Sequence, residues 1–280
     1  MSADTGTIVL KKETMKRLIK DVKEMLRAPL ISHGVYYQHD DNNFLKGYAL
    51  VIGSKDTPYE NGYYFFELDY PANYPFSPPK VTYYTNDGYT RFNPNLYKCG
   101  KVCLSILNTW RGDQWSACQT ISSVLLALCT VFNDNPLLNE PGVTTSHPDV
   151  KKYNKVIQYK NYEIAIMQMV KRIVLATDLD ENTDFGKFIV FKDILKTHFL
   201  ENYVSIKDKI AAAATAQAHA QAAQEAQIAK IGQTAQISTA AQGAQQIGCE
   251  TFYIGIYSMT INIYYSTLLT RFQEMHAQMA

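Results

Sequence analysis

Four short runs of strand-forming residues follow one another early in the chain, and they constrain its fold more than any other feature. The runs cover residues 35–38, 47–52, 63–70 and 80–85 and are rich in β-branched and aromatic side chains. Asn61-Gly62, just before the third run, is a typical tight-turn sequence. Four short strands in sequence predict an antiparallel meander.

A proline-rich connector leads into the last of these runs. Pro75, Pro78 and Pro79 fix the backbone φ angle at several positions, which predicts a rigid segment ahead of the strand. Phe76 lies within this connector. An exposed loop position and an ordinary core position are both open for it.

Helical patterns lie on both sides of the strands. Residues 10–27 form an amphipathic, basic pattern, and Pro29 stands just past its end. Residues 116–119 have the sequence of a capping box, with Ser at the N-cap and Gln at N3, and predict the start of a second helix. Residues 134–136 would stop this helix. Its predicted apolar face consists of Ile121, Val124, Leu125, Leu128 and Phe132.

Beyond residue 148 the pattern is again helical. Residues 153–176 and 188–203 carry apolar side chains at helical spacing. Residues 211–247 are rich in Ala and Gln, which favour helix formation but supply almost no large apolar side chains to bury. We therefore predict a mobile or frayed helical linker there. The predicted fold class is α+β, a four-stranded antiparallel meander flanked by helices and followed by a mostly helical C-terminal extension.

One uncharged segment, residues 252–269, is near the minimum length for a membrane span. Polar side chains are scattered through it, and its tyrosines lie within the segment instead of gathering at the membrane interfaces. We interpret the segment as a buried element and expect no membrane span.

Charge and cysteine content limit the possible partners. The net charge is +1 and 19% of the residues are charged, which argues against nucleic-acid binding by phosphate neutralisation, so the partners should be proteins. The odd number of cysteines and the absence of a secretion-type start predict a reducing compartment. Cys99 and Cys103 lack a second Cys or His pair at ligand spacing, so we expect no metal.

The segment Phe92–Leu107 carries the most specific chemistry, because Asn95 precedes Cys103 by eight residues. A thiolate can take and hold an acyl group, and a fixed amide N–H can stabilise the oxyanion that forms when an amine attacks it. The pair therefore predicts acyl transfer from a thioester. Asn95 has a second, compatible interpretation as a structural amide that ties the loop to backbone groups.

These motifs resemble the catalytic fold of ubiquitin-conjugating enzymes over residues 10–145. The resemblance rests on the segment Tyr74–Val81, the Asn93-Pro94-Asn95 sequence, the segment Gly100–Leu107 and Trp115-Ser116. Most of the family has His-Pro-Asn where this chain has Asn93-Pro94-Asn95. That difference and the sequence Asn-Glu-Pro-Gly at residues 139–142 are similar to the large subgroup with C-terminal extensions, which also has a short helix like residues 264–272.

The resemblance implies a function. Cys103 would accept ubiquitin or a ubiquitin-like modifier from an activating enzyme as a thioester, and would transfer it to a lysine or to a ligase. No cofactor of its own is implied, because the activating enzyme consumes the ATP. The implied partners are the modifier, the activating enzyme, a ligase and protein substrates, in the cytoplasm or nucleus of a eukaryotic cell or host.

Surface residues can be assigned to partners by the same resemblance. Phe76 and Ser116 would contact a ligase, although Ala117-Cys118 replaces the usual Pro-Ala and predicts a departure from the common ligase repertoire. A solvated face is an equally open interpretation for each lysine of the first helix. The basic residues that would meet the activating enzyme are Lys11, Lys12, Lys16 and Arg17.

The acceptor lysine must lose a proton, and many members of the family place an acidic residue after the second main helix to assist. The matching position here is Asn135, with Asp134 beside it. This substitution weakens a simple general-base account. Both residues are candidates for positioning the acceptor lysine, and both could equally be helix-ending residues without a catalytic role.

Two other functions are open. A non-catalytic, ubiquitin-binding scaffold of the same fold would typically lack the active cysteine, whereas Cys103 is present in a full motif. A Cys-dependent hydrolase would need a histidine that activates Cys103 and a third orienting group, and none of the six histidines has a recognisable local signature.

The predicted domain organisation has four parts. Residues 1–148 form the catalytic core, and residues 149–206 form a helical extension packed on it. Residues 207–249 form the Ala/Gln-rich linker, and residues 250–280 form a docking C-terminal helix.

Overall fold

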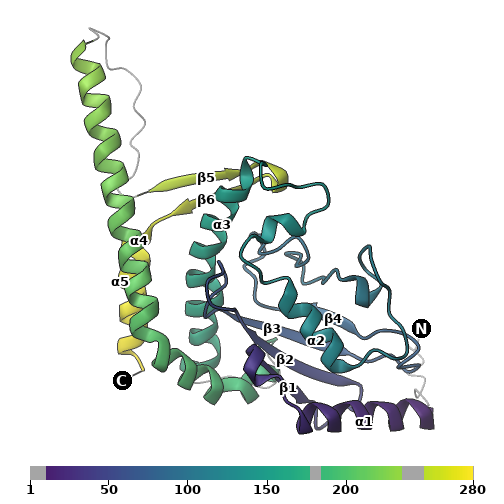
Figure 1. Ribbon diagram of the computed structural model, residues 1–280. Coiled ribbons are helices and arrows are strands. Elements are labelled where there is room, and N and C mark those ends of the chain that lie inside the picture. Colours follow the sequence, from purple (N-terminus) through teal and green to yellow (C-terminus); the bar gives the residue numbers. More distant parts are fainter. Residues whose placement is uncertain (1–10, 177–183, 235–248, 280) are drawn as a thin grey trace, which may run out of the picture.

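A four-stranded antiparallel sheet lies at the centre of the fold (Figure 1). The computed structural model describes residues 11–176, 184–234 and 249–279. The strands pair in sequence order, which confirms the predicted meander and the α+β class. They are β1 (Val35–His39), β2 (Lys46–Ile52), β3 (Tyr63–Asp69) and β4 (Lys80–Tyr83).

Both faces of the sheet are covered. On one face, Tyr64 packs against Phe132, which follows helix α2 (Ile121–Thr130), with ring centroids 4.4 Å apart. On the other face, Phe65 packs against Phe188 of the C-terminal extension at 4.8 Å. Nearly all of β3 is therefore buried, and its sequence lacks the polar alternation of a strand with one solvated face.

Helix α2 begins one turn later than the sequence predicts. Its N-cap is Thr120, whose hydroxyl accepts a hydrogen bond from the backbone N–H of Ser123, and the Ser123 hydroxyl accepts one in return. The predicted capping box over residues 116–119 is therefore wrong. The physical reason is Arg17 of helix α1 (Lys12–Arg27), whose guanidinium donates to two carbonyl groups of that segment at 2.5 and 2.6 Å and holds it as a turn. The predicted apolar face of α2 is buried, as expected.

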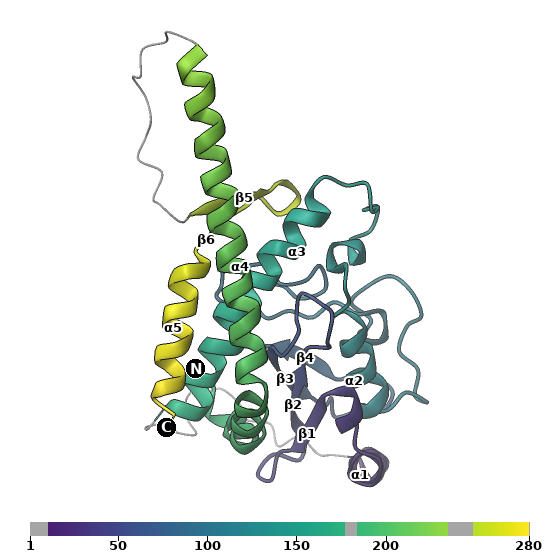
Figure 2. The same ribbon diagram turned by 60° about the vertical axis from the view of Figure 1, so that its left-hand side comes forward.

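The C-terminal extension begins beside the sheet, and the end of its long helix α4 (Lys192–Thr234) projects away from the sheet (Figures 1 and 2). Helix α3 (Asp149–Lys160) continues through π-helical turns at Asn161–Gln168 and Lys171–Leu175. A 3-10 segment (Gly186–Phe191) then crosses the sheet and leads into α4.

Helix α4 continues where the sequence predicts a linker. Ile206 and Ile210 are buried, and the buried amide of Gln217 donates to the Ile263 carbonyl at 2.9 Å and accepts from the Tyr265 N–H at 3.1 Å. These contacts join this part of α4 to the C-terminal segment, and the helix continues to Thr234. The rest of the predicted linker, residues 235–248, lies outside the described residues.

The segment after residue 249 begins with a β-hairpin and not with a helix. Strands β5 (Glu250–Ile254) and β6 (Met259–Ile263) pair antiparallel, and α5 (Tyr265–Ala277) then lies beside α4 in both views (Figures 1 and 2). The C-terminal helix is thus present, but most of the uncharged segment is this hairpin. No helix within the described residues is long and apolar enough to span a membrane.

Candidate active site

A buried amide network organises the turn at Asn93. Its Nδ2 donates to the Tyr59 hydroxyl at 2.9 Å and to the Val131 carbonyl at 2.7 Å. Its Oδ1 accepts from the Asn95 N–H at 2.9 Å and from Nδ2 of Asn139 at 3.4 Å. An amide has two donor hydrogens and two acceptor lone pairs, so Asn93 uses its full capacity while it is completely buried. This replacement for the family's usual histidine therefore acts as a structural centre of the turn.

Arg91 supports the same turn from the other side. Its Nε donates to the Asn93 carbonyl at 3.1 Å, and its Nη2 donates to the Pro94 carbonyl at 2.7 Å. The guanidinium carbon lies 3.2 Å from the centroid of the Tyr97 ring. Charge-assisted bonds of this kind are stronger than bonds between neutral groups, so the backbone of the turn is firmly held.

Asn95 and Cys103 are joined by two hydrogen bonds. Nδ2 of Asn95 donates to the Cys103 carbonyl at 2.7 Å, and the Cys103 N–H donates to the Asn95 carbonyl at 2.9 Å. Both residues are buried, and Cys103 is only 2% exposed. The structure thus contains the loop-tying contact predicted for Asn95. A primary amide nitrogen carries a second hydrogen, so donation to an oxyanion is compatible with this bond.

Thr109 bonds to the backbone of both residues next to Cys103. Its hydroxyl accepts from the Leu104 N–H at 3.0 Å and lies 3.1 Å from the Val102 carbonyl. Both neighbours of Cys103 are therefore fixed by one side chain. Thr109 was not predictable from the sequence, because a threonine in a polar loop has no pattern that indicates such a contact.

Gly100 allows the segment before Cys103 to approach β4. Its φ is +86°, a conformation that disfavours a side chain, and its carbonyl accepts from the Tyr83 N–H at 2.8 Å. A Cβ at this position would lie 2.9 Å from the Tyr83 carbonyl oxygen, which is too close for an ordinary contact. The close approach of these two backbones therefore requires glycine.

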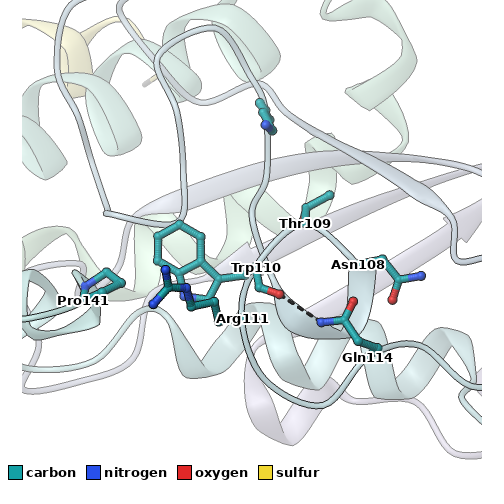
Figure 3. A pocket seen from close by; sticks show the side chains of 7 residues that line it. Asn108, Thr109, Trp110, Arg111, Gln114 and Pro141 are labelled. Carbon is teal, nitrogen blue, oxygen red and sulfur yellow. Dashed lines mark hydrogen bonds between the residues drawn. The ribbon is translucent and has the colours of Figure 1, made fainter.

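A groove runs along residues 108–111 of the loop that follows Cys103 (Figure 3). Its volume is about 780 Å³. The amide of Gln114 donates to the carbonyls of Trp110 and Gly112, both at 3.1 Å, and so shapes one of its loops. Lys101 and Arg111 are exposed, and neither forms an ion pair with another described residue. The groove is lined by Lys101, Asn108, Thr109, Trp110, Arg111, Gln114 and Pro141.

Asp134 and Asn135 are engaged with helix α3. Nδ2 of Asn135 donates to the Asp134 carboxylate at 2.9 Å, and Nδ2 of Asn154 on α3 donates to the Asp134 carbonyl at 2.9 Å. Asp134 lines a separate cavity of about 580 Å³, together with residues of α3 and α4. Within the described part of the chain, neither Asp134 nor Asn135 has a side-chain hydrogen bond to Cys103. Their predicted role at the acceptor lysine stays a prediction.

The residues predicted to contact an activating enzyme differ in their surroundings. Lys11, Lys12 and Lys16 are exposed on and beside α1. Arg17 is instead an internal link, because it pairs with Asp21 at 2.9 Å, binds the turn before α2, and has a side chain only 21% exposed. Its guanidinium is thus largely used within the chain.

The residues predicted to contact a ligase lie on two loops that touch. Phe76 is 73% exposed, so the core interpretation of this residue is wrong. Ser116 is also exposed. Between them, the indole N–H of Trp115 donates to the Pro75 carbonyl at 2.7 Å, which joins the two loops.

None of the six histidines has a hydrogen bond or ring contact with Cys103 in the part of the chain that the structure describes. All six are described, and the recorded contacts of His33, His39, His147, His198 and His276 are with residues other than Cys103. His219 is exposed on α4. No group of three or more His, Cys, Asp or Glu side chains arranged to hold a metal ion is found in the described residues.

The family of ubiquitin-conjugating enzymes matches this chain over residues 17–162, which is more than half of it. The match contains the amide network, Cys103 and Thr109. The chain belongs to the ubiquitin-conjugating enzyme family. The resemblance predicted from the sequence is therefore confirmed.

Several ubiquitin-conjugating enzymes of animals are similar in sequence. Ubiquitin-conjugating enzyme E2 Z of Danio rerio is 38% identical over 174 residues, which cover 61% of this chain and 52% of that protein. The Homo sapiens E2 Z is 40% identical over 162 residues, which cover 57% and 45%. A probable ubiquitin-conjugating enzyme, protein 17 of Caenorhabditis elegans, is 36% identical over 174 residues, covering 58% and 24%. The chain thus spans about half the length of the first two relatives, and less of the third.

Proposed function

We propose that this ubiquitin-conjugating enzyme carries ubiquitin or a ubiquitin-like modifier as a thioester on Cys103 and transfers it to a lysine amine or to a ligase cysteine. The observation that carries the proposal is the double link between Asn95 and Cys103, at 2.7 and 2.9 Å. It places an amide donor beside the backbone of the only cysteine that stands within the family's motif.

Loading and discharge are two acyl transfers. In loading, the Cys103 thiolate attacks the thioester carbonyl on the activating enzyme, a new C–S bond forms, and the activating enzyme's thiolate leaves. In discharge, the neutral amine of a lysine attacks the carbonyl, and the Cys103 thiolate leaves while the nitrogen loses a proton. The second N–H of Asn95 would donate to the oxyanion that forms in this step.

The burial of Cys103 suits a carrier of acyl groups. A thioester that waits for its acceptor must be protected from hydrolysis, and a closed site excludes water. Cys103 is only 2% exposed, which would restrict the access of water to a thioester at this position.

The groove lined by Lys101 and Arg111 supports a role for charge in discharge. The side chains of Asp134 and Asn135 bond to each other, and Asn154 of α3 bonds to the Asp134 backbone carbonyl. Charge in the groove would be a second influence that favours the neutral form of the acceptor amine. Nearby positive charges lower the pKa of a lysine ammonium group, and Lys101 and Arg111 supply two such charges. The same charges would favour acceptor lysines whose neighbours are acidic.

The partners follow from the family and from the surface. Lys11, Lys12 and Lys16 would meet the activating enzyme, and Phe76 with Ser116 would meet a ligase, with other proteins as substrates. A location in the cytoplasm or nucleus is compatible with this set of partners.

A charging assay tests the proposal directly. The full chain is incubated with ubiquitin, ATP and one activating enzyme at a time, and the products are separated on a non-reducing gel. A band heavier by one ubiquitin should form and should disappear with thiol reductant. Cys103→Ala should abolish it, whereas Cys99→Ala and Cys118→Ala, which change exposed cysteines, should retain it. A band that survives in Cys103→Ala would contradict the assignment of the nucleophile.

A further inference from the structure

The tip of the C-terminal hairpin touches the catalytic segment through Tyr257. This residue lies in the turn between β5 and β6. Its hydroxyl donates to the Glu140 carboxylate at 2.7 Å. Its ring centroid lies 5.5 Å from the Arg91 guanidinium and 5.8 Å from the ring of Tyr153. One side chain of the extension thus contacts three residues of the region matched by the family.

Glu140 is placed between the amide network and the groove. Its neighbour Asn139 donates to the side chain of Asn93 at 3.4 Å and to the Val131 carbonyl at 3.2 Å. Its other neighbour, Pro141, lines the groove (Figure 3). A hydrogen bond at Glu140 therefore restrains both structures at once.

Arg91 provides a second route from Tyr257 to the same turn. Its guanidinium binds the carbonyls of Asn93 and Pro94, and its own carbonyl accepts from the Tyr153 hydroxyl at 2.6 Å. Tyr257 packs near both Arg91 and Tyr153, so it restrains the guanidinium from the outer side. Attraction between a cation and an aromatic ring at this distance adds to that restraint.

The hairpin tip is itself fixed to the core, so Tyr257 is not a loose contact. The Ile256 N–H donates to the Asp149 carboxylate at 3.1 Å. The Tyr89 hydroxyl accepts from the Thr260 N–H at 3.1 Å and lies 3.2 Å from the Thr260 carbonyl. Bonds on both sides of the turn therefore hold Tyr257 in place.

We propose that Tyr257 is a positioning residue for modifier transfer, and that the C-terminal hairpin completes the scaffold of the active site. The inference rests on the proposed function of Cys103. Tyr257 touches no reacting atom. It acts through Glu140 on the groove wall and through Arg91 on the turn that leads to Asn95, and both must stay in place for the amine to attack in the right geometry.

The chemistry of Tyr257 suits this role over the whole physiological pH range. Burial, followed by its hydrogen bond to Glu140, raises the pKa of Tyr257 well above its usual value. The hydroxyl therefore remains a donor. Removal of the hydroxyl alone, by Tyr257→Phe, deletes the bond to Glu140 and keeps the ring against Arg91.

The test compares Tyr257→Phe with a matched control in the full chain. Tyr253→Phe removes an exposed hydroxyl from the same hairpin. Discharge of the thioester to free lysine is measured over a range of lysine concentrations. We expect kcat to fall about tenfold in Tyr257→Phe, since a small misplacement of reacting groups has a large effect on rate. KM for lysine, the extent of loading and the melting temperature should stay close to those of the wild type and of Tyr253→Phe.

A double-mutant cycle identifies the bond. Glu140→Ala should slow discharge as much as Tyr257→Phe, and the double variant should be no slower than either single variant. Glu140→Gln keeps an acceptor oxygen and should retain most of the wild-type rate. Additive losses in the double variant, or an unchanged kcat in Tyr257→Phe, would overturn the inference.

Hydrogen exchange gives a readout that does not depend on activity. In Tyr257→Phe, backbone amides of residues 92–104 should exchange faster than in the wild type, and Tyr253→Phe should leave them unchanged. Equal exchange in all three proteins would overturn the inference even if none of them could be loaded. The wild type could fail to load while residues 92–104 still exchange faster in Tyr257→Phe than in the wild type. That result would count against the proposed function alone.

Discussion

Lys187 of the C-terminal extension forms an ion pair with Glu67 of β3. Lys46 of β2 pairs with the same carboxylate, and the Tyr84 hydroxyl donates to it at 2.9 Å. The Glu67 side chain is only 6% exposed. The extension is therefore attached to the sheet by charge as well as by the aromatic contact between Phe188 and Phe65.

This arrangement predicts a loss of stability in acid. Burial alone would raise the pKa of Glu67, but the bonds from Lys187, Lys46 and Tyr84 outweigh it and lower the pKa to about 2. An unfolded glutamate has a pKa of about 4.3, so the stabilisation is fully present above that value and is lost as the pH falls towards 2. After a discount for solvent screening, it amounts to about 2 kcal/mol in the free energy of unfolding.

Denaturant unfolding of Glu67→Gln and the wild type checks this prediction. The two proteins should differ most above pH 5 and should converge as the pH falls to 2 and 3. Glu24→Gln alters an exposed pair on α1 and should change the free energy of unfolding by less than about 0.5 kcal/mol. A gap between Glu67→Gln and the wild type that does not depend on pH would contradict the prediction.

Asn95→Ala should separate loading from discharge. Loading should stay close to the wild-type level, because the site of the activating enzyme can also stabilise the oxyanion in that step. Discharge to free lysine should slow by about 100-fold, the usual effect of removing one oxyanion donor. Asn42→Ala, which changes an exposed loop residue, is the control. Equal loss of loading and discharge would instead support a purely structural role for Asn95.

Charge reversal in the groove should change the preference for acceptors. With Lys101 and Arg111 both replaced by Glu, transfer to a peptide whose lysine is flanked by aspartates should fall about tenfold, because like charges then face each other. Transfer to a peptide with alanine flanks should change less, and added salt should reduce the difference. Lys98→Glu changes an exposed charge that does not line the groove and is the matched control. Parallel losses with both peptides would argue against charge-based selection.

Gly100→Ala should be more destabilising than Gly88→Ala. Both glycines have a left-handed φ, +86° and +72°, so both substitutions introduce backbone strain of about 1–2 kcal/mol. Only Gly100 adds a clash, with the Tyr83 carbonyl oxygen at 2.9 Å, whereas a Cβ at Gly88 meets nothing within 4 Å. Urea unfolding should show an additional loss of about 1–3 kcal/mol for Gly100→Ala. Equal losses would mean that the approach to β4 can relax.

Elements that depend on local periodicity were predictable from the sequence. The four strands of the meander lie within one or two residues of their expected bounds, and the face of α2 is buried as expected. The N-cap of α2 was not predictable, because Arg17 determines it from a hundred residues away. The β5–β6 hairpin did have a signal, since Met259, Ile261 and Ile263 alternate with polar residues and are the buried side chains of β6.

The candidate site divides in the same way. Asn95 and Cys103 stand in a motif whose spacing can be read from the sequence, so the sequence alone predicted them as site residues. Thr109, Arg91 and Tyr257 take their roles from contacts between separate segments. The contact of Tyr257 with Glu140 joins positions 117 residues apart, and no local pattern reports it.

Phe188 of the extension covers one face of the sheet, so removal of the extension would uncover that face. A chain cut after residue 185 would lose the ring that packs 4.8 Å from Phe65 and the histidine that bonds to the Tyr63 hydroxyl at 3.0 Å. Aromatic side chains of β3 that are now fully buried would meet water. The extension is therefore part of the folding unit that contains the sheet, and we expect a chain cut after residue 185 to aggregate.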